Sequence, residues 1–150
     1  MPPDGELTHG TLQMIINHSY VDIQSNESFL DVGSGRGATA LQVALSRKNI
    51  TLAAGVELSS SRHAQACSAL LRLTQLSEKV FLSSSSISLV KEDMFAMDWS
   101  MFDVVYVSAL CFRRSMMLEI QKKLIQEVKP GSRIFSLRAF PPRTTPLHGR

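Results

Sequence analysis

The chain has 150 residues, of which 44% are hydrophobic and 19% charged, and its net charge at neutral pH is +3. This is the length of one ordinary domain, and the balance of residues excludes a disordered chain. No apolar run approaches the roughly 20 residues of a membrane-spanning helix, and residues 1–4 lack the regions of a secretion signal, so we expect a soluble intracellular protein. Two cysteines without ligand spacing, Cys67 and Cys111, predict neither a zinc site nor a disulfide framework.

Helix-like and strand-like segments alternate through the first half of the chain. Apolar residues at helical spacing predict a helix at about 12–18, after which 28–32 reads as a strand that is apolar on both sides, like a central parallel strand. A helix at 38–46, a strand at 51–57 and a long helix at 59–76 follow. The positions predicted to face the sheet are Leu41, Ala44 and Leu45 in the shorter helix and Ala64, Cys67, Leu70 and Leu71 in the long one.

The second half begins with four serines at 83–86, which predict a loop because serine side chains compete with the backbone for hydrogen bonds. The connection between the next two strands is too short for a full helix, so we expect a turn or two at 95–99. The other elements expected here are, in order, strands at 87–90 and 102–107, a helix at 115–128 that buries Met117, Ile120 and Leu124, and a strand at 133–137.

This alternation predicts an α/β fold with a Rossmann-like, mostly parallel sheet of five strands. The expected organisation is a leader and helix at 1–27, a nucleoside-binding domain at 28–140 and a basic, proline-containing tail at 141–150. No strand pattern follows the fifth strand. Its open edge would therefore invite pairing with a second copy of the chain.

A glycine-dense turn, Asp31-Val32-Gly33-Ser34-Gly35-Arg36-Gly37, lies between the first strand and the next helix. Glycine tolerates positive φ and has no Cβ, so a ligand and the following helix can approach the strand end closely. Glu57 ends the next strand, where an acid can accept hydrogen bonds from ribose hydroxyls. A strand, glycine turn, helix, strand and acid in this order predict a nucleoside-cofactor site.

The position of Asp31 indicates which nucleoside binds. The third glycine comes one residue earlier than in the dinucleotide pattern G-x-G-x-x-G, and a carboxylate at Asp31 would repel a pyrophosphate but attract the ammonium and sulfonium of S-adenosylmethionine. Asp93, at the end of the third strand, is placed to accept from the adenine amino group. S-adenosylmethionine is therefore the expected cofactor. The alternatives are a nicotinamide cofactor, a purely structural turn in which Asp31 caps the helix, and an Asp93 that only caps its strand.

Segments distributed over the chain share one family pattern: Glu6-Leu7-Thr8, Phe29 to Gly37, Leu41 to Ala44, Gly55 to Ser59, Arg62-His63-Ala64, Asp93-Met94-Phe95, Val105-Tyr106-Val107, Phe112, Pro130 to Ile134 and Arg138-Ala139-Phe140. Together they resemble the class I, non-SET histone lysine methyltransferases named for disruption of telomeric silencing. The glycine turn alone is common to many methyltransferases. Its conjunction with the leader Gly5-Glu6 and with the short connection before the fourth strand is more specific.

The resemblance implies a class I methyltransferase fold and transfer of a methyl group from S-adenosylmethionine to a lysine amine. It implies cofactor contacts at Glu6, Gly33, Gly35, Glu57, Asp93 and Met94, to which the turn and the strand ends add Asp31, Ser34, Gly37 and Leu58. The candidates for the methyl-transfer channel are Ser108, Phe112 and Phe140. The chain departs from the family pattern at Ser108-Ala109, where the family has two asparagines, at Asp4, where it has a tyrosine, and after the fifth strand, where it has a strand hairpin.

The functional hypothesis is a histone-type lysine methyltransferase with a histone or nucleosome as its protein substrate, nuclear if it acts on chromatin and cytoplasmic otherwise. Two alternatives stay open: a cofactor-binding module without transfer activity, and a methyltransferase for RNA or a small molecule. The basic tail, with Arg138, Arg143 and Arg150, is either a solvated end or a candidate contact for an acidic partner such as a nucleic acid. We expect no membrane contact and no metal.

Overall fold

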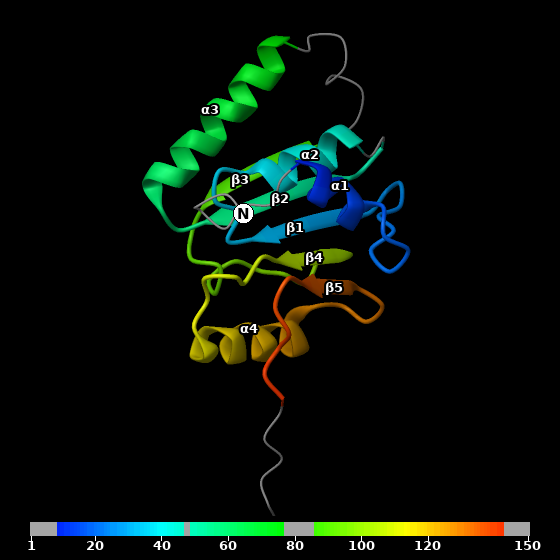
Figure 1. Ribbon diagram of the computed structural model, residues 1–150, viewed down its shortest axis with the longest axis vertical. Coiled ribbons are helices and arrows are strands. Elements are labelled where there is room, and N and C mark those ends of the chain that lie inside the picture. Colours follow the sequence, from blue (N-terminus) through cyan, green and yellow to red (C-terminus); the bar gives the residue numbers. More distant parts are fainter. Residues whose placement is uncertain (1–8, 47–48, 77–85, 143–150) are drawn as a thin grey trace, which may run out of the picture.

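The computed structural model describes residues 9–46, 49–76 and 86–142 as a sheet with helices on both faces (Figure 1). All five strands run parallel, in the order β3-β2-β1-β4-β5. The predicted α/β fold with a parallel sheet is thereby confirmed. The elements in chain order are α1 (His9–Ile16), β1 (Ser28–Val32), α2 (Ala38–Ser46), β2 (Leu52–Glu57), α3 (Ser60–Leu76), β3 (Ser86–Lys91), β4 (Val104–Val107), α4 (Arg114–Glu127) and β5 (Arg133–Ser136).

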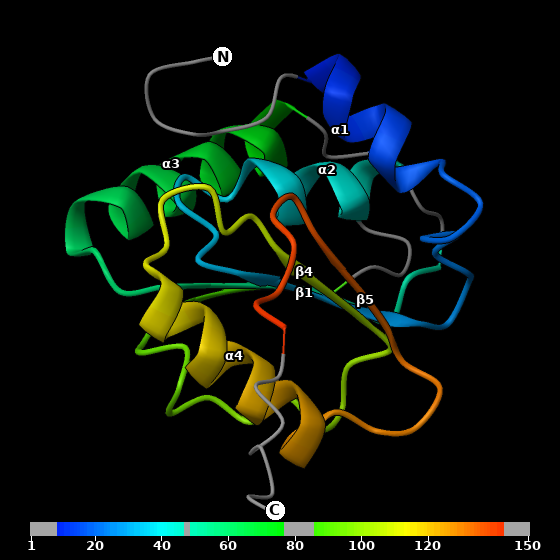
Figure 2. The same ribbon diagram turned by 60° about the horizontal axis from the view of Figure 1, so that its bottom comes forward.

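Helices α1, α2 and α3 lie on one face of the sheet and α4 lies on the other (Figure 2). Successive strand residues point to opposite faces, so the strands supply two hydrophobic clusters. In β1, Phe29 belongs to the cluster beneath α1 and α2, and Leu30 belongs to the cluster beneath α4; Val104 and Val105 of β4 alternate in the same way. Each fully buried side chain of this size contributes about 1.5–3 kcal/mol. The sheet is therefore held from both sides.

The connection between β3 and β4 contains turns and no helix, as expected. The Asp93 carboxylate accepts a hydrogen bond from the Phe95 N–H at 2.9 Å, and the Asp93 carbonyl accepts one from the Ala96 N–H at 2.9 Å. Trp99 and Phe102, farther along the connection, are fully buried in the cluster beneath α4. Two aromatic side chains thus fill the space beside α4 that a crossover helix would otherwise cover.

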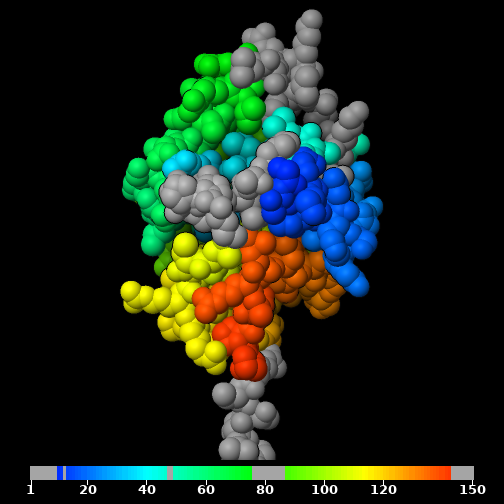
Figure 3. Space-filling model, viewed as in Figure 1, coloured from blue at the N-terminus to red at the C-terminus, as the bar shows by residue number. Residues whose placement is uncertain are grey.

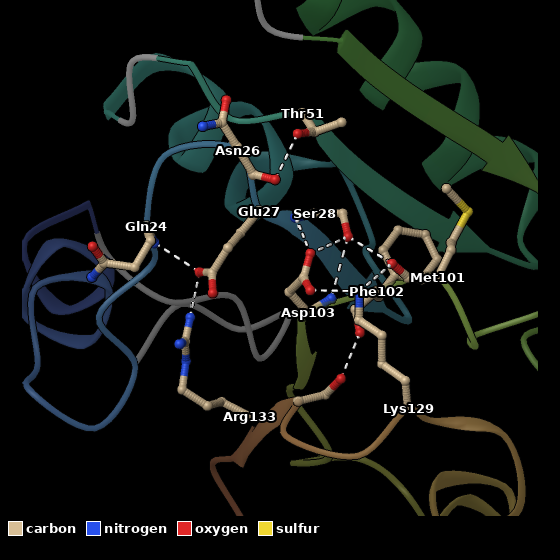
Figure 4. A network of polar contacts seen from close by, with 11 residues as sticks. Gln24, Asn26, Glu27, Ser28, Thr51, Met101, Phe102, Asp103, Lys129 and Arg133 are labelled. Carbon is tan, nitrogen blue, oxygen red and sulfur yellow. Dashed lines mark hydrogen bonds and ion pairs between the residues drawn. The ribbon is translucent and has the colours of Figure 1, made fainter.

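Polar contacts fasten the amino ends of three strands (Figure 4). Asp103 accepts hydrogen bonds at 2.8 Å from both the backbone N–H and the hydroxyl of Ser28, and it pairs with Lys129 at 2.5 Å. Burial raises the pKa of Asp103, but the bonds from Lys129 and Ser28 outweigh it and hold that pKa below its ordinary value. Arg133 and Glu27 form a second ion pair. These contacts join β1, β4 and β5 at the end of the sheet where the strands begin.

The predicted buried faces of the helices are confirmed in α4 and partly wrong in α2 and α3. Met117, Ile120 and Leu124 are buried. In α2, Leu45 is 47% exposed, because the buried stripe ends at Ala44. Among the side chains of α3 whose burial is described, Ala66 is buried, and the exposed ones include Ala64, Cys67 and Leu71. The orientation of α3 is set by the close approach of Ala66 to Gly37. A Cβ added to Gly37 would lie 3.0 Å from the Cβ of Ala66. Helical spacing alone does not reveal such a contact.

Strands β3 and β5 are the two edges of the sheet in the described part of the chain. Residues 137–142 follow β5 without forming a strand, and pairing of the β5 edge with a second copy stays a prediction. The cofactor contact expected at Glu6 and most of the basic tail fall in residues 1–8 and 143–150, outside the described residues. None of the helices described here combines the length and the apolar character needed to cross a membrane.

Candidate functional site

A cavity of about 610 Å³ lies at the carboxyl ends of β1, β2, β3 and β4. It surrounds the point between β1 and β4 where the order of the strands changes direction, which is where open α/β sheets bind their ligands. Its volume falls within the roughly 300–1,000 Å³ of small-molecule sites. Its lining contains these predicted residues: Asp31, Gly33, Ser34, Gly35, Glu57, Leu58, Asp93, Met94, Ser108 and Phe112.

The glycine turn bends over the end of β2. Gly33 and Gly35 have φ of 72° and 55°, in the left-handed region that favours glycine. The N–H groups of Gly33 and Ser34 both donate to the Val56 carbonyl, at 3.0 and 2.9 Å. Beneath the turn lies Gly55 of β2, on which a Cβ would stand 2.8 Å from both Cβ and Oγ of Ser34. The turn therefore requires a residue without a side chain in the neighbouring strand, a requirement that our sequence reasoning missed.

Glu57, at the end of β2, is 5% exposed and accepts three hydrogen bonds from its surroundings. One carboxylate oxygen accepts from the Ser59 N–H at 2.7 Å and from Arg62 Nη2 at 2.9 Å, and the other accepts from the Gly35 N–H at 3.0 Å. Burial raises the pKa of Glu57, but the bonds from Arg62, Ser59 and Gly35 and the charge of Arg62 together lower it below the ordinary value. Glu57 is therefore ionised at neutral pH.

Asp31 and Tyr106 are paired in the parallel register of β1 and β4, and both line the cavity. Asp31 is 2% exposed. Burial and the nearby charge of Asp31 raise the pKa of Tyr106, and a hydrogen bond with Ser108 only partly opposes them. The Tyr106 hydroxyl therefore stays protonated and does not serve as a general base at neutral pH. Tyr106 was not among the predicted site residues, because its pairing with Asp31 depends on the order of the strands in the sheet.

Asp93, Met94 and Leu58 form the side of the cavity that faces β3 and α3. The Asp93 carboxylate caps the turn that follows it, through the bond to the Phe95 N–H. The capping interpretation of Asp93 is thus observed, and its contact with adenine stays a prediction. Leu58 is 66% exposed, which leaves an apolar side chain at the rim of the cavity for a ligand to cover.

The loop after β4 forms the wall opposite the glycine turn. Ala109 has φ of 58°, and its carbonyl accepts a hydrogen bond from the Phe112 N–H at 3.2 Å. The Phe112 ring rests on the turn, since a Cβ placed on Gly33 would lie 2.9 Å from Phe112 Cζ. This ring therefore spans the crevice between the ends of β1 and β4.

Two predicted site residues lie outside the cavity lining. Gly37 packs beneath α3 against Ala66, and Phe140 packs against the cluster beneath α4; neither is among the lining residues. Glu6 falls outside the described residues. Conversely, Arg62 lines the cavity and was not predicted as a site residue, although its place one turn into a helix after Glu57 could have suggested it.

The arrangement suits a nucleoside that carries positive charge. Glu57 offers oxygens to hydroxyl groups, Asp31 favours a cation, and Leu58 and Phe112 offer apolar surfaces to a flat ring and to a reacting group. Within the described ranges, His, Cys, Asp and Glu side chains form no group of three or more that could hold a metal ion.

Comparison with known proteins gives one family. A model of the family described as "Histone methylation protein DOT1" matches residues 4–149. That match covers nearly the whole chain, including the glycine turn and the loop after β4. No curated protein sequence matches the chain.

Several solved structures share the fold. An RNA methyltransferase from Salinibacter ruber in complex with S-adenosyl-L-homocysteine superposes with a TM-score of 0.70 at 16% identity, over 87% of this chain and 76% of that chain. A SAM-dependent methyltransferase from Thiobacillus denitrificans, also in complex with S-adenosyl-L-homocysteine, superposes with a TM-score of 0.58 at 16% identity, over 87% of this chain and 48% of that chain. Coclaurine N-methyltransferase, bound to N-methylheliamine and SAH, superposes with a TM-score of 0.60 at 22% identity, over 80% of this chain and 32% of that chain. This chain spans less than half the length of the last two.

Proposed function

The chain belongs to the histone methylation protein DOT1 family, and on this premise we propose that it is an S-adenosylmethionine-dependent methyltransferase acting on a lysine amine of a histone-type protein. The observation that carries the proposal is the gathering of Asp31, Glu57 and Asp93 around one cavity at the point where the strand order changes direction. A nuclear location, on chromatin, follows from that acceptor.

S-adenosylmethionine fits the donors and acceptors of the cavity. A carboxylate has about four lone-pair positions, and Gly35, Ser59 and Arg62 engage three of those on Glu57. One position is left for a ribose hydroxyl, and displacement of Arg62 supplies a second. The negative charge of Asp31 favours the cationic amino-acid end of the cofactor. Adenine would cover the exposed Leu58.

When bound, this cofactor supplies a methyl group on a positively charged sulfur. The protein must then align an amine with that methyl group and exclude water. A lysine amine attacks only after it loses its proton, and apolar walls at Phe112, Met94 and Met116 lower the pKa of an entering amine because they disfavour its charged form. Ser108, at the end of β4, offers a hydroxyl oxygen to the amine N–H. Ala109 offers no polar group.

The test is transfer of a labelled methyl group by the full chain. The acceptors offered are nucleosomes, free histones, RNA and a metabolite extract, and Glu57→Gln serves as the variant that disables the ribose contact. We expect label on a histone lysine, located by mass spectrometry, and none with Glu57→Gln. Label in RNA or in a small molecule would contradict the lysine acceptor.

The departure at Ser108-Ala109 favours one alternative, a protein that binds the cofactor without transferring its methyl group. That alternative predicts no label in any fraction together with a rise in melting temperature on addition of S-adenosylhomocysteine. Absence of both label and thermal shift would contradict the assignment of the cavity itself.

A further inference from the structure

Arg138 reaches from the segment after β5 to the loop after β4. Its Nη1 donates a hydrogen bond to the Phe112 carbonyl at 2.7 Å, across 26 positions of sequence. In the space-filling view (Figure 3) the red-orange surface of the segment after β5 lies beside the yellow surface at the start of α4. A charged donor makes a stronger bond to a carbonyl than a neutral one does. This contact therefore joins the two segments that follow the paired strands β4 and β5.

The loop that Arg138 holds has few regular contacts of its own. Ala109 occupies the left-handed region, and the Phe112 N–H closes a single turn onto the Ala109 carbonyl. Arg113, the N-cap of α4, makes no side-chain capping bond. The start of α4 consequently lacks the side-chain cap that usually fixes a helix entry. The bond from Arg138 supplies an anchor at the residue where the loop passes into the helix.

Phe112 carries the effect of that anchor to the cavity. Its ring lies on Gly33 and spans the crevice between β1 and β4, while its carbonyl faces Arg138. A shift of the backbone at Phe112 moves the ring relative to the glycine turn. Arg138 itself lies outside the cavity, since it is not among the lining residues in the described part of the chain.

We propose that Arg138 is a positioning residue, which holds the Phe112 backbone so that the Phe112 ring closes the crevice at the glycine turn and thereby raises the affinity for the cofactor. This inference rests on the proposed function for its ligand, S-adenosylmethionine or its product. Arg138 is itself exposed, so its removal loosens the loop while the two hydrophobic clusters stay packed.

The first measurement uses the protein without any ligand. Hydrogen exchange of the Phe112 amide reports the turn that this residue closes onto Ala109. In Arg138→Ala we expect its exchange to become roughly tenfold faster while the strand amides keep theirs. Arg138→Lys, which retains a charged donor, should restore most of the protection. The matched control is Arg72→Ala, because Arg72 is also exposed and also donates to a backbone carbonyl, that of Ser68, within α3.

The second measurement is the affinity for S-adenosylhomocysteine by calorimetry. We expect Arg138→Ala to weaken binding about three- to tenfold, the range of one hydrogen bond, and Arg72→Ala to leave it unchanged. In a Phe112→Ala background the same Arg138→Ala change should cause no further loss, because the ring through which Arg138 acts is gone. Circular dichroism and the melting temperature establish that each variant is folded.

Three results would overturn the inference: unchanged exchange at Phe112, faster exchange without weaker binding, or an equal loss of affinity in the Phe112→Ala background. A general fall in melting temperature with faster exchange throughout the sheet would make Arg138 a merely structural residue, which also contradicts it. Failure of the unaltered chain to bind S-adenosylhomocysteine would instead overturn the proposed function. The exchange measurement on the free protein still decides whether Arg138 holds the loop.

Discussion

Arg62 and Glu57 form an ion pair, with Nη2 and Oε1 2.9 Å apart, at the acid that the proposed function assigns to the ribose. The two side chains differ greatly in exposure, 58% for Arg62 and 5% for Glu57. Arg62 is therefore held on the solvent side of a carboxylate that points into the cavity. A nucleoside that uses both ribose hydroxyls must compete with Arg62 for Glu57.

Replacement of Arg62 tests this competition. We expect Arg62→Ala to bind S-adenosylhomocysteine about threefold more tightly, because the ribose no longer displaces the exposed guanidinium of Arg62 from Glu57, a contact worth about 1 kcal/mol. Calorimetry measures the change, and Arg72→Ala on the outer part of the same helix is the control. Weaker binding in Arg62→Ala would mean that the guanidinium contacts the ligand directly.

Glu57 gives a prediction for pH. Its pKa in the folded protein lies below the ordinary 4.5, so its contribution to stability is fully present above that ordinary value and is lost as the pH falls through the lower folded value. Glu57→Gln should lower the free energy of unfolding by about 1–3 kcal/mol at neutral pH, because an amide nitrogen cannot accept a hydrogen bond from Gly35 or Ser59. The difference in unfolding free energy between the two proteins should shrink on acidification below 4.5. Urea titrations at several pH values measure it, and a difference independent of pH would contradict the role of the charge.

Gly55 gives a steric prediction. A methyl group there would stand 2.8 Å from Cβ and Oγ of Ser34, so Gly55→Ala should lower the free energy of unfolding by about 1–3 kcal/mol. Gly10 is the control, since nothing lies within 4 Å of a Cβ at that helical position and Gly10→Ala should stabilise by about 0.5–1 kcal/mol. Adding Ser34→Gly to Gly55→Ala removes the nearest atoms and should recover part of the loss. An unchanged free energy of unfolding in Gly55→Ala would contradict the close approach of Ser34 to Gly55.

Ala109 gives a prediction from its backbone. With φ of 58° it occupies a region that β-branched residues avoid and asparagine tolerates. Ala109→Val should cost about 1–3 kcal/mol of stability, whereas Ala109→Asn should leave the melting temperature closer to that of the parent, because asparagine tolerates this backbone conformation. Ala109→Asn also supplies an amide beside Ser108, and we expect more methyl transfer to histones. Equal stability of the two variants would contradict the assigned conformation.

The fold was predictable where the signal is local. The glycine turn, the acid at Glu57 and the short connection after Asp93 all follow from a few consecutive residues, and the structure has each in its expected place. The orientation of α3 was not predictable. Its apolar residues fit more than one helical face, and the choice is made by Ala66 packing on Gly37, a contact between two elements.

The site was predictable to the same extent. Asp31 and Glu57 are strand-end acids, and their types and positions identify them. Tyr106 enters the cavity only because β4 lies beside β1 in the sheet, and the bond from Arg138 to the Phe112 carbonyl depends on where the chain passes after β5. Such contacts depend on the tertiary arrangement, which periodicity and motif spacing do not encode.

The polar contacts of Ser28 and Asp103 lie at the opposite end of β1 and β4 from Ser108 and Phe112. The residues whose hydrogen bonds join the strands are thus different from those that would contact a methyl acceptor. Substitutions in the loop after β4 therefore leave the contacts between Ser28 and Asp103 in place. Under the proposed function, this separation makes the loop after β4 the place to redesign the choice of acceptor.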